Sequence, residues 1–440
     1  MEMRFTYLFI IVLFYSIDLN SQTWEQVGEG FDWNVYDLTS FNGNLYACGR
    51  LGPASRGVYM WDGVQWINTG SIFGIHSPLS IEAYQSELYT SGDFTGPNGS
   101  PTKVFRLEGE EWVQQGANFT GADWNSVKTL KQYENQLFAG GQFEMIGGDS
   151  IRNIAAWDGN VWNNVGEGLP DLVVELDIFQ NSLIACHYKY DTLVDNNSNT
   201  YIDLRTKLQR WDGNVWIDLD TIFDNKHVYL LGVSDSGLIF GSADTIHGVP
   251  INNIGIWDGS NVYSIGDSLF TSYSVATEFN DEIYVACQIS TDNPFSNASR
   301  IRKLVNTEWV NVGGLFNDHI LALHQHEDVL FIGGFFDEYE GAEMNYVAML
   351  GSVLDVEIIG EDNKLDISPN PTYGSIEIKS NGELIESLDI LSNDGQKMLE
   401  IDNINESEIN VHLDYVPTGL CFIRVFTKNG RVIVKKVIKY

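Results

Sequence analysis

The chain has 440 residues, a formal net charge of −35, 42 glycines and 12% aromatic residues, while only 19% of its residues are charged. This composition favours short strands joined by tight turns and excludes a disordered chain. The negative charge repels phosphate backbones and anionic headgroups, so it argues against nucleic acid and peripheral membrane partners. The simplest interpretation is that the charge keeps an extracellular protein soluble. The charge is also compatible with binding of cationic partners or divalent ions.

The N-terminus has the pattern of a signal peptide. An apolar run over residues 5–15 follows Arg4, and this run is too short to span a bilayer. We predict a signal peptide over residues 1–21, cleaved between Ser21 and Gln22. No cysteine lies near this point, which argues against a lipid-anchored lipoprotein.

Two sequence signals recur together through residues 22–351. The first is an apolar stretch that ends in small residues, and its seven copies lie at 45–49, 88–92, 137–141, 183–186, 238–241, 283–287 and 330–334. The second is a hairpin motif, which is clearest at Trp61, Asp62 and Gly63, at Trp157, Asp158 and Gly159, and at Trp211, Asp212 and Gly213. Glycine adopts the positive φ that such a turn needs, so we interpret the aspartates as turn residues rather than ligands or catalysts.

The two signals together predict four short strands in each repeat. In the first repeat we expect strands at 34–41, 44–51, 57–61 and 65–69. This period is that of propeller blades. The last copy has no outer strand, and residues 23–28 match one, so we expect the first and last segments to pair. The sequence therefore predicts an all-β chain whose residues 22–351 form a seven-bladed β-propeller closed by an N/C-terminal strand clasp.

The repeats resemble those of kelch-like propellers, best seen from Phe138 to Trp162. The resemblance covers roughly residues 22–351 and concerns the fold. Propellers of this kind include enzymes, adhesins and scaffolds, so it does not choose a function.

The four cysteines do not resemble a disulfide framework. Cys48, Cys186 and Cys287 all fall in the repeated apolar strand, where other copies have Gly140, Ser91 or Gly333. We therefore expect a buried position for small residues.

A linker over residues 352–364 leads to a small all-β module at 365–440. Its motif residues are Pro369, Asn370, Pro371, Gly374, Gly395, Gly419, Lys435 and Lys436. In this order they resemble the type A sorting domain of the type IX secretion system of Bacteroidetes. An ordinary accessory sandwich is the alternative interpretation. Cys421 departs from the family, which usually has an aromatic residue there.

That resemblance implies an Ig-like β-sandwich that the type IX secretion machinery recognises and usually cleaves off. The rest of the protein is then secreted, or attached to lipopolysaccharide at the outer cell surface after passing through the periplasm. The alternation over residues 422–426 and 432–438 suits half-buried strands, and Asn429-Gly430 suits a hairpin turn.

Candidate ligand-binding residues lie in the loops at one face of the predicted ring. We expect its recurring aromatics, Phe31, Phe73, Phe119, Phe223, Phe270 and Phe316, with Leu169 in the remaining copy, to pack between blades rather than stack on sugars. His76, His227 and His319 follow three of them and are interpreted as solvated or capping residues rather than metal ligands. Loop carboxylates include Asp93, Glu144, Asp149, Asp337, Glu338 and Glu340.

No catalytic triad, phosphate-binding loop or cofactor motif occurs in the sequence, so no catalytic, cofactor or metal residue is assigned. The segment 191–199 invites a calcium interpretation, but it lacks the glycine and final glutamate of the known loop. We expect an exported binding protein for a glycan or protein ligand, without enzymatic activity. The alternative is a polysaccharide-active enzyme with carboxylates on the channel face, which acids converging in an aromatic-lined pocket would favour.

Overall fold

The computed structural model of the protein describes residues 23–52, 56–70, 77–94, 102–121, 125–194, 200–224, 226–242, 245–251, 253–266, 272–289, 297–351, 365–370, 372–380, 384–392, 397–401, 403–413, 416–417, 419–428 and 432–439. This described part is all-β, with no helix, and so no helix in it could cross a membrane. The chain divides into two compact units, residues 1–351 and 352–440. Ser21, Gln22 and the predicted linker lie outside the described residues.

The described part of the first unit contains seven four-stranded antiparallel sheets, which confirms the predicted four-strand repeat. The first three sheets, in order from innermost to outermost strand, are β2 (Val35–Phe41), β3 (Asn44–Arg50), β4 (Arg56–Trp61) and β5 (Trp66–Asn68); β6 (Pro78–Tyr84), β7 (Glu87–Gly92), β8 (Val104–Glu108) and β9 (Glu111–Gln114); and β11 (Ser126–Tyr133), β12 (Gln136–Gln142), β15 (Ile154–Trp157) and β16 (Trp162–Asn164).

The remaining sheets continue in chain order. They are β17 (Val173–Phe179), β18 (Ser182–Val194), β19 (Thr200–Trp211) and β20 (Trp216–Asp218); β21 (Tyr229–Ser234), β22 (Gly237–Ser242), β25 (Asn253–Trp257) and β26 (Val262–Ser264); β27 (Ser272–Phe279), β28 (Glu282–Gln288), β29 (Ser299–Val305) and β30 (Glu308–Asn311); and β31 (Ile320–His326), β32 (Val329–Gly334), β35 (Val347–Leu350) and β1 (Trp24–Gln26).

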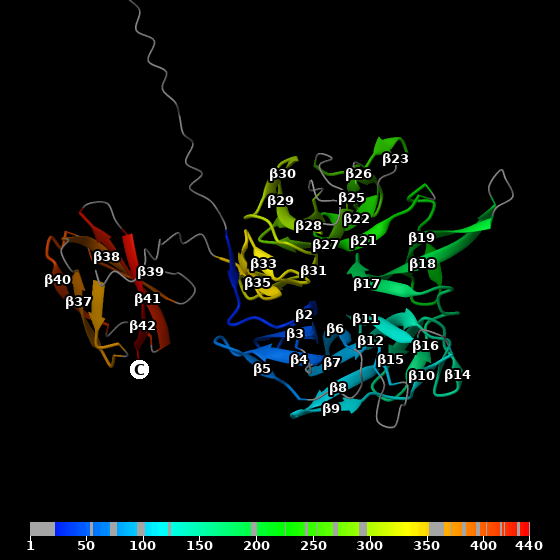
Figure 1. Ribbon diagram of the computed structural model, residues 1–440, viewed down its shortest axis with the longest axis horizontal. Helices are drawn as coiled ribbons and strands as arrows, with labels where there is room; N and C mark the ends of the chain where they lie inside the picture. The colour runs from blue at the N-terminus through cyan, green and yellow to red at the C-terminus, as the bar shows by residue number, and fades with distance from the viewer. Residues whose placement is uncertain are drawn as a thin grey trace, which may run out of the picture. The chain divides into compact units, whose positions relative to one another are not determined.

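The innermost strands contact one another in a closed order, β2, β6, β11, β17, β21, β27, β31 and back to β2. Figure 1 shows the sheets extending outward from this centre. Short strands lie in the loops between second and third strands: β13 (Met145–Ile146), β14 (Asp149–Ser150), β23 (Thr245–Ile246), β24 (Val249–Pro250), β33 (Glu338–Tyr339) and β34 (Ala342–Glu343). β10 (Phe119–Thr120) lies between the second and third sheets and pairs with β13.

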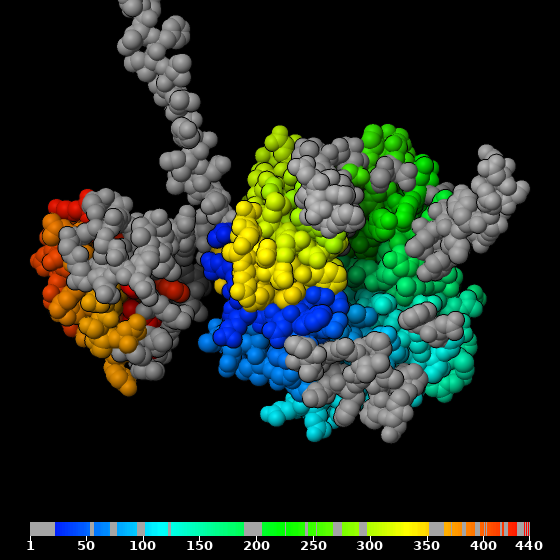
Figure 2. All heavy atoms as spheres, in the orientation of Figure 1, coloured from blue at the N-terminus to red at the C-terminus, as the bar shows by residue number. Residues whose placement is uncertain are grey.

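The seventh sheet joins the two ends of the first unit. β1 pairs antiparallel with β35 through Trp24 and Leu350, as the sequence predicts. The Trp24 indole is 3% exposed, and its Nε1 donates a hydrogen bond to the Val312 carbonyl at 2.9 Å. Figure 2 shows the blue N-terminal segment packed against the yellow segment that precedes residue 351.

The small residues of the repeated apolar stretch permit two close approaches. A Cβ on Gly49 would lie 2.2 Å from the Asn34 carbonyl oxygen within its own sheet. A Cβ on Gly140 would lie 2.6 Å from Cγ1 of Val173 in the next sheet. Backbone pairing and packing between sheets therefore both require small residues at these positions.

The cysteines follow the same pattern. Cys48 pairs with Asp37 and Cys186 pairs with Glu175. Both cysteines occupy the strand position that Gly140 occupies in the third sheet. Cys287 lies one residue further along its strand. All four cysteines of the chain are buried and free.

The second unit contains two antiparallel sheets around one apolar core. One sheet has β36 (Leu365–Ser368), β37 (Ser375–Ser380) and β40 (Glu408–His412), and the other has β39 (Lys397–Ile401), β38 (Ile385–Ser392), β41 (Gly419–Thr427) and β42 (Val432–Lys439). Cys421, Ile423 and Val425 point inward from β41, so the aromatic position of the family is here a buried cysteine. Asp389 is buried, and its Oδ2 accepts a hydrogen bond from Nη2 of Arg424 at 2.5 Å.

Replacement of Trp24 tests the pairing of the two ends. We expect Trp24→Ala to lower the free energy of unfolding by about 3–5 kcal/mol, because a buried aromatic side chain is removed and the Val312 carbonyl loses its donor. Urea denaturation measures this change. The control Val64→Ala removes a side chain that is 79% exposed and should change stability by less than about 0.5 kcal/mol. Equal stability of both variants would contradict the proposed importance of the pairing.

Candidate functional site

The Trp-Asp-Gly aspartates are engaged within their own turns. Oδ1 of Asp62 accepts hydrogen bonds from the backbone N–H groups of Val64 and Gln65 at 2.8 and 2.7 Å. Asp158 and Asp212 accept the equivalent pair, and these bonds lower the pKa of all three carboxyls. Gly63, Gly159 and Gly213 have φ values of 93°, 103° and 97°. This geometry supports the turn interpretation of the motif.

The recurring aromatics that the structure describes are buried. The residues Phe31, Phe119, Leu169, Phe223 and Phe316 are at most 7% exposed, while Phe73 and Phe270 lie outside the described residues. Their burial favours packing between sheets over ligand stacking.

The predicted loop histidines are not assembled into a metal site in the described part of the chain. His76 lies outside it, the His227 ring packs on Tyr229 with centroids 4.5 Å apart, and His319 contacts Asp318. No group of three or more His, Cys, Asp or Glu side chains among the described residues is placed to hold a metal ion. The side chains of the segment 191–199 are outside the described set.

The loop carboxylates fall on different sheets. Asp93 of the second sheet pairs with Lys103 at 2.8 Å, and Glu144 and Asp149 belong to the loop that carries β13 and β14. Asp337, Glu338 and Glu340 lie together on the loop that carries β33 and β34 in the seventh sheet. Asp337 and Glu338 of this last group line a pocket with aromatic walls.

That pocket has a volume of about 680 Å³ and lies where the first and seventh sheets meet. We call it the junction pocket; residues 29–32, Leu51, Tyr59, Trp66 and side chains from 337–346 line it. Gly30 has a φ of 67°, and a Cβ there would lie 2.4 Å from the Asn345 carbonyl oxygen. That oxygen accepts a hydrogen bond from the Phe31 backbone N–H at 3.0 Å, which fixes the two segments together.

Aromatic side chains form one wall of the junction pocket. The buried Phe31 ring lies 4.8 Å from that of Trp66 and 5.5 Å from that of Tyr59. Trp66 Nε1 donates a hydrogen bond to the Val27 carbonyl at 3.1 Å. Tyr59 and Trp66 are half-buried and line the pocket.

Carboxylates supply the charge of the junction pocket. The lining contains Glu29, Asp32, Asp337, Glu338 and Glu343 but no lysine or arginine. Burial and the negative charges of Asp337, Asp32 and Asp318 raise the pKa of Tyr346. The lining thus combines acids from the loop that carries β33 and β34 and from the segment after β1 with the Tyr346 phenol.

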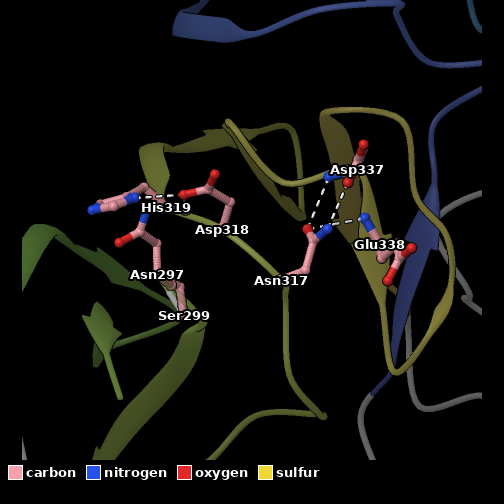
Figure 3. Close-up of polar contacts among 7 residues, drawn as sticks. All are labelled: Asn297, Ser299, Asn317, Asp318, His319, Asp337 and Glu338. Carbon is pink, nitrogen blue, oxygen red and sulfur yellow. Dashed lines mark hydrogen bonds and ion pairs between the residues drawn. The ribbon is translucent and has the colours of Figure 1, made fainter. Parts of the chain in front are cut away.

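Asn317 positions the acidic loop. Its Oδ1 accepts hydrogen bonds from the backbone N–H groups of Asp337 and Glu338 at 3.0 and 3.1 Å, and its Nδ2 donates to Asp337 Oδ1 at 2.5 Å (Figure 3). His319 Nδ1 lies 2.6 Å from Asp318 Oδ1 beside this group. The Asp337 carboxylate is thereby held toward Asn317 rather than free to rotate.

A second polar region lies in the central channel, a cavity of about 460 Å³ lined by the innermost strands. Each innermost strand has a register shift near its start. When the strands are aligned on this shift, Asp37 and Glu175 share one level of the channel, and Glu82, Lys131, Asp177 and His324 share the next.

The channel charges bridge successive sheets. Oδ2 of Asp37 accepts a hydrogen bond from the Ile81 backbone N–H at 3.0 Å, and Glu82 Oε1 accepts one from Gln132 N–H at 3.0 Å. Lys131 Nζ lies 2.7 Å from Asp177 Oδ1. These contacts connect the first four sheets through their innermost strands.

Burial in the channel perturbs these groups. It raises the pKa of Asp37 to about 6 and of Glu82 to about 7. The pKa of Glu175 rises to about 8 through desolvation between the channel walls and the Asp177 charge, although its side chain is exposed to the water of the channel. Burial alone would lower the pKa of Lys131, but the carboxylates of Asp177 and Glu82 outweigh it and raise that pKa. Groups with such shifts in a cavity are common at functional sites.

The channel residues and part of the junction pocket were not predicted from the sequence. Asp32 lies more than 300 positions before Asn345 and Tyr346 and meets them because β1 completes the seventh sheet. The channel charges carry one detectable signal. Side chains of a strand point alternately to its two faces. Asp37, Glu82, Lys131 and Asp177 could therefore have been placed on the channel face once the register shift of the innermost strands was known.

The pH dependence of stability tests the channel chemistry. Because the folded state raises the pKa of Glu175, it binds this proton more tightly than the unfolded chain does. The stabilisation is complete below the unfolded pKa and is lost as pH rises toward about 8. We expect Glu175→Gln to match the native protein at pH 4 and to exceed it in stability at pH 9, by about 1 kcal/mol after allowance for channel water.

Urea midpoints at the two pH values measure this difference. Glu110→Gln changes an exposed glutamate on the β8–β9 turn and should show no such pH-dependent gain. A Glu175→Gln variant that is no more stable than the native protein at pH 9 would contradict the assignment.

Comparisons with known proteins add a family for the C-terminal unit. The computationally designed Ika8 protein is similar to the chain at 11% identity and a TM-score of 0.42, with 94% of this chain and 100% of that one covered. The extracellular domain of a one component system from B. thetaiotaomicron is similar at 12% identity and a TM-score of 0.49, with 96% of this chain and 59% of that one covered. An α-L-arabinofuranosidase from Clostridium thermocellum is similar at 9% identity and a TM-score of 0.25, with 86% of this chain and 96% of that one covered. With TM-scores below 0.5, these likenesses carry no functional argument.

No curated protein matches the chain in sequence. Residues 366–440 match the family model described as the secretion system C-terminal sorting domain. Within the described part of this module, Pro369 and Asn370 follow β36, Gly374 precedes β37, Gly419 begins β41, and Lys435 and Lys436 lie in β42, whereas Pro371 and Gly395 fall outside the described residues. Residues 366–440 thus form a secretion-system C-terminal sorting domain, which indicates export of the protein through the type IX secretion system to the cell surface or the surroundings.

Proposed function

We propose that this protein is a secreted or surface-attached binding protein whose first unit is a kelch-like seven-bladed β-propeller and whose junction pocket takes a carbohydrate. The seven four-stranded sheets and the closed order of contacts among their innermost strands support the propeller. The observation that carries the ligand proposal is the combination of aromatic and carboxylate side chains in one pocket.

Sugars fit such a pocket for two physical reasons. Their C–H faces pack on aromatic rings, and Tyr59 and Trp66 present half-buried rings to the pocket. Their hydroxyl groups donate hydrogen bonds, which the carboxylates of Asp32, Asp337 and Glu338 can accept. The five acids of the lining would repel uronic acids and sulfated sugars, so we infer a neutral glycan.

A polysaccharide-active enzyme is the second candidate. The presence of Asp32 and Asp337 in one aromatic-lined pocket favours it, since glycoside hydrolysis commonly uses two carboxylates. The exposure of Asp32 and Asp337 favours binding over catalysis, because a general acid usually relies on burial to retain its proton at neutral pH. We therefore rank binding first.

Delivery completes the proposal. We infer that residues 1–21 direct the chain to the periplasm and that the C-terminal unit, an Ig-like sandwich in this proposal, is removed after recognition by the secretion machinery. The released first unit then either diffuses away or stays attached to lipopolysaccharide.

Carbohydrate binding by the full chain tests the junction pocket. A neutral-glycan array and a polysaccharide depletion assay, read together for binding and for product release, should give binding without products. We expect Trp66→Ala to weaken binding at least tenfold, because it removes an aromatic wall of the pocket.

Trp216→Ala is the matched control. Trp216 occupies the equivalent position in the fourth sheet and donates its Nε1 hydrogen bond to Val165 at 3.1 Å, as Trp66 does to Val27. Equal losses in the two variants would point to general destabilisation and contradict the pocket assignment. Product release that Asp337→Asn abolishes would instead establish the enzyme.

Removal of residues 365–440 tests the delivery route. We expect the truncated chain to accumulate in the periplasm, because the module matched by the sorting-domain family is gone. Cell fractionation with immunoblotting measures this. The control Val64→Ala changes an exposed turn residue and should leave export unchanged. Normal export of the truncated chain would overturn the role assigned to the module.

A further inference from the structure

Tyr346 has a backbone conformation that is rare for its residue type. Its φ is 65°, in the left-handed region that glycine and asparagine adopt most readily. In the described part of the chain it is the one phenylalanine, tyrosine or tryptophan with a positive φ. A bulky side chain is strained in this conformation, and strained residues cluster at binding and catalytic sites.

The equivalent residue is an asparagine in two other sheets. Tyr346 directly precedes β35, and its carbonyl oxygen accepts a hydrogen bond from the Gly334 N–H at 3.2 Å. Asn153 directly precedes β15 and accepts the corresponding bond from the Gly141 N–H at 3.0 Å. Asn253 occupies the same register position at the start of β25. The φ values of Asn153 and Asn253 are 61° and 81°, so this position has a positive φ in all three sheets.

In the third sheet the asparagine also stabilises the fold. Asn153 is buried, and its Oδ1 accepts a hydrogen bond from the Phe143 N–H at 3.1 Å. Its Nδ2 donates to the Leu169 carbonyl oxygen at 2.9 Å. A tyrosine has no amide and cannot make this pair of bonds. The seventh sheet therefore has a tyrosine where an asparagine would suit the backbone better, which points to a role other than stability.

Tyr346 lines the junction pocket, where hydrogen-bond acceptors outnumber side-chain donors. Nε1 of Trp66 already donates to a backbone carbonyl. Nδ2 of Asn345 donates to the Glu29 carbonyl oxygen at 3.2 Å and to Glu343 Oε1 at 2.9 Å. No residue in the described part of the chain accepts a hydrogen bond from the Tyr346 hydroxyl. Because a phenol carries its proton at neutral pH, this hydroxyl is available as a donor to a ligand.

We propose that Tyr346 determines the specificity of the junction pocket by donating a hydrogen bond to an oxygen atom of the bound sugar. This inference rests on the proposed carbohydrate binding. A sugar hydroxyl can accept one hydrogen bond and donate another, so a hydroxyl that accepts from Tyr346 can donate to Asp32 or Asp337 in the same lining. The pocket then selects neutral ligands with free hydroxyl groups over apolar molecules that could only pack on Tyr59 and Trp66.

Tyr346→Asn introduces the residue of the third and fifth sheets and tests the proposal in the full chain. We expect a urea midpoint at least as high as that of the native protein, because asparagine adopts a positive φ with less strain. On the neutral-glycan array we expect binding at least about tenfold weaker, because the ligand loses its donor. A tyrosine that served the fold alone would give a lower midpoint instead.

Tyr346→Phe separates the hydroxyl from the ring. It should keep the native urea midpoint and still weaken binding by about tenfold, since only the donor is removed. The matched control is Asn153→Ala, which removes the two side-chain bonds of the third sheet. This control should lower the urea midpoint and leave binding on the array unchanged, because Asn153 does not line the junction pocket.

The outcomes separate the donor role from carbohydrate binding itself. Undiminished binding by both Tyr346 variants, with the native chain binding a glycan, would overturn the donor role alone. A Tyr346→Asn midpoint well below the native value would assign the tyrosine to the fold and would overturn it as well. If the native full chain bound no glycan of the array, the proposed function would fail and the donor role with it.

Discussion

The first unit depends on one short antiparallel pairing, in which the three residues of β1 complete a sheet whose other strands lie some 300 positions later. Without β1, the seventh sheet would expose the backbone of β35 as an unpaired edge. The pairing also brings residues 29–32 to the loop that carries β33 and β34, which creates the junction pocket. Closure of the fold and assembly of the candidate site are therefore the same structural event.

The centre of the ring combines apolar packing with charge. Valines such as Val35 and Val173 pack against the glycine of the adjacent sheet, while Asp37, Glu82 and Lys131 reach from one innermost strand to the next. The charges lie on the first four sheets, and the channel side of the fifth and sixth sheets carries Gly232, Val275 and Thr277. The channel is consequently polar on one side, although the strand repeat that builds it is regular.

Much of this fold could be predicted from the sequence because its signals are local. An Asp-Gly turn, such as Asp62-Gly63, specifies a hairpin within four residues. The small residue at Gly49 is required because its backbone lies close to the segment before the preceding strand. The pairing of β1 could also be predicted, since an outer strand is missing at one end of the array and present at the other.

The candidate sites were less predictable, because they depend on contacts between sheets. Asp337 and Glu338 are two among many loop acids in the sequence, and nothing local indicates that Asn317 fixes them. Tyr346 is an ordinary loop residue until the first and seventh sheets meet. The register shift in each innermost strand likewise moves the channel charges by one position relative to a simple alternation.

The position of β1 at the start of the described chain has a consequence for biosynthesis. During synthesis the N-terminal strand emerges first, yet its partner β35 ends at Leu350, so Trp24 must wait unpaired while six complete sheets form. Each of those sheets pairs its strands in chain order and can assemble as it appears, whereas the last one cannot. The residues of β1 are therefore synthesised first and paired last. The order of the innermost strands cannot close until nearly the whole first unit has been made.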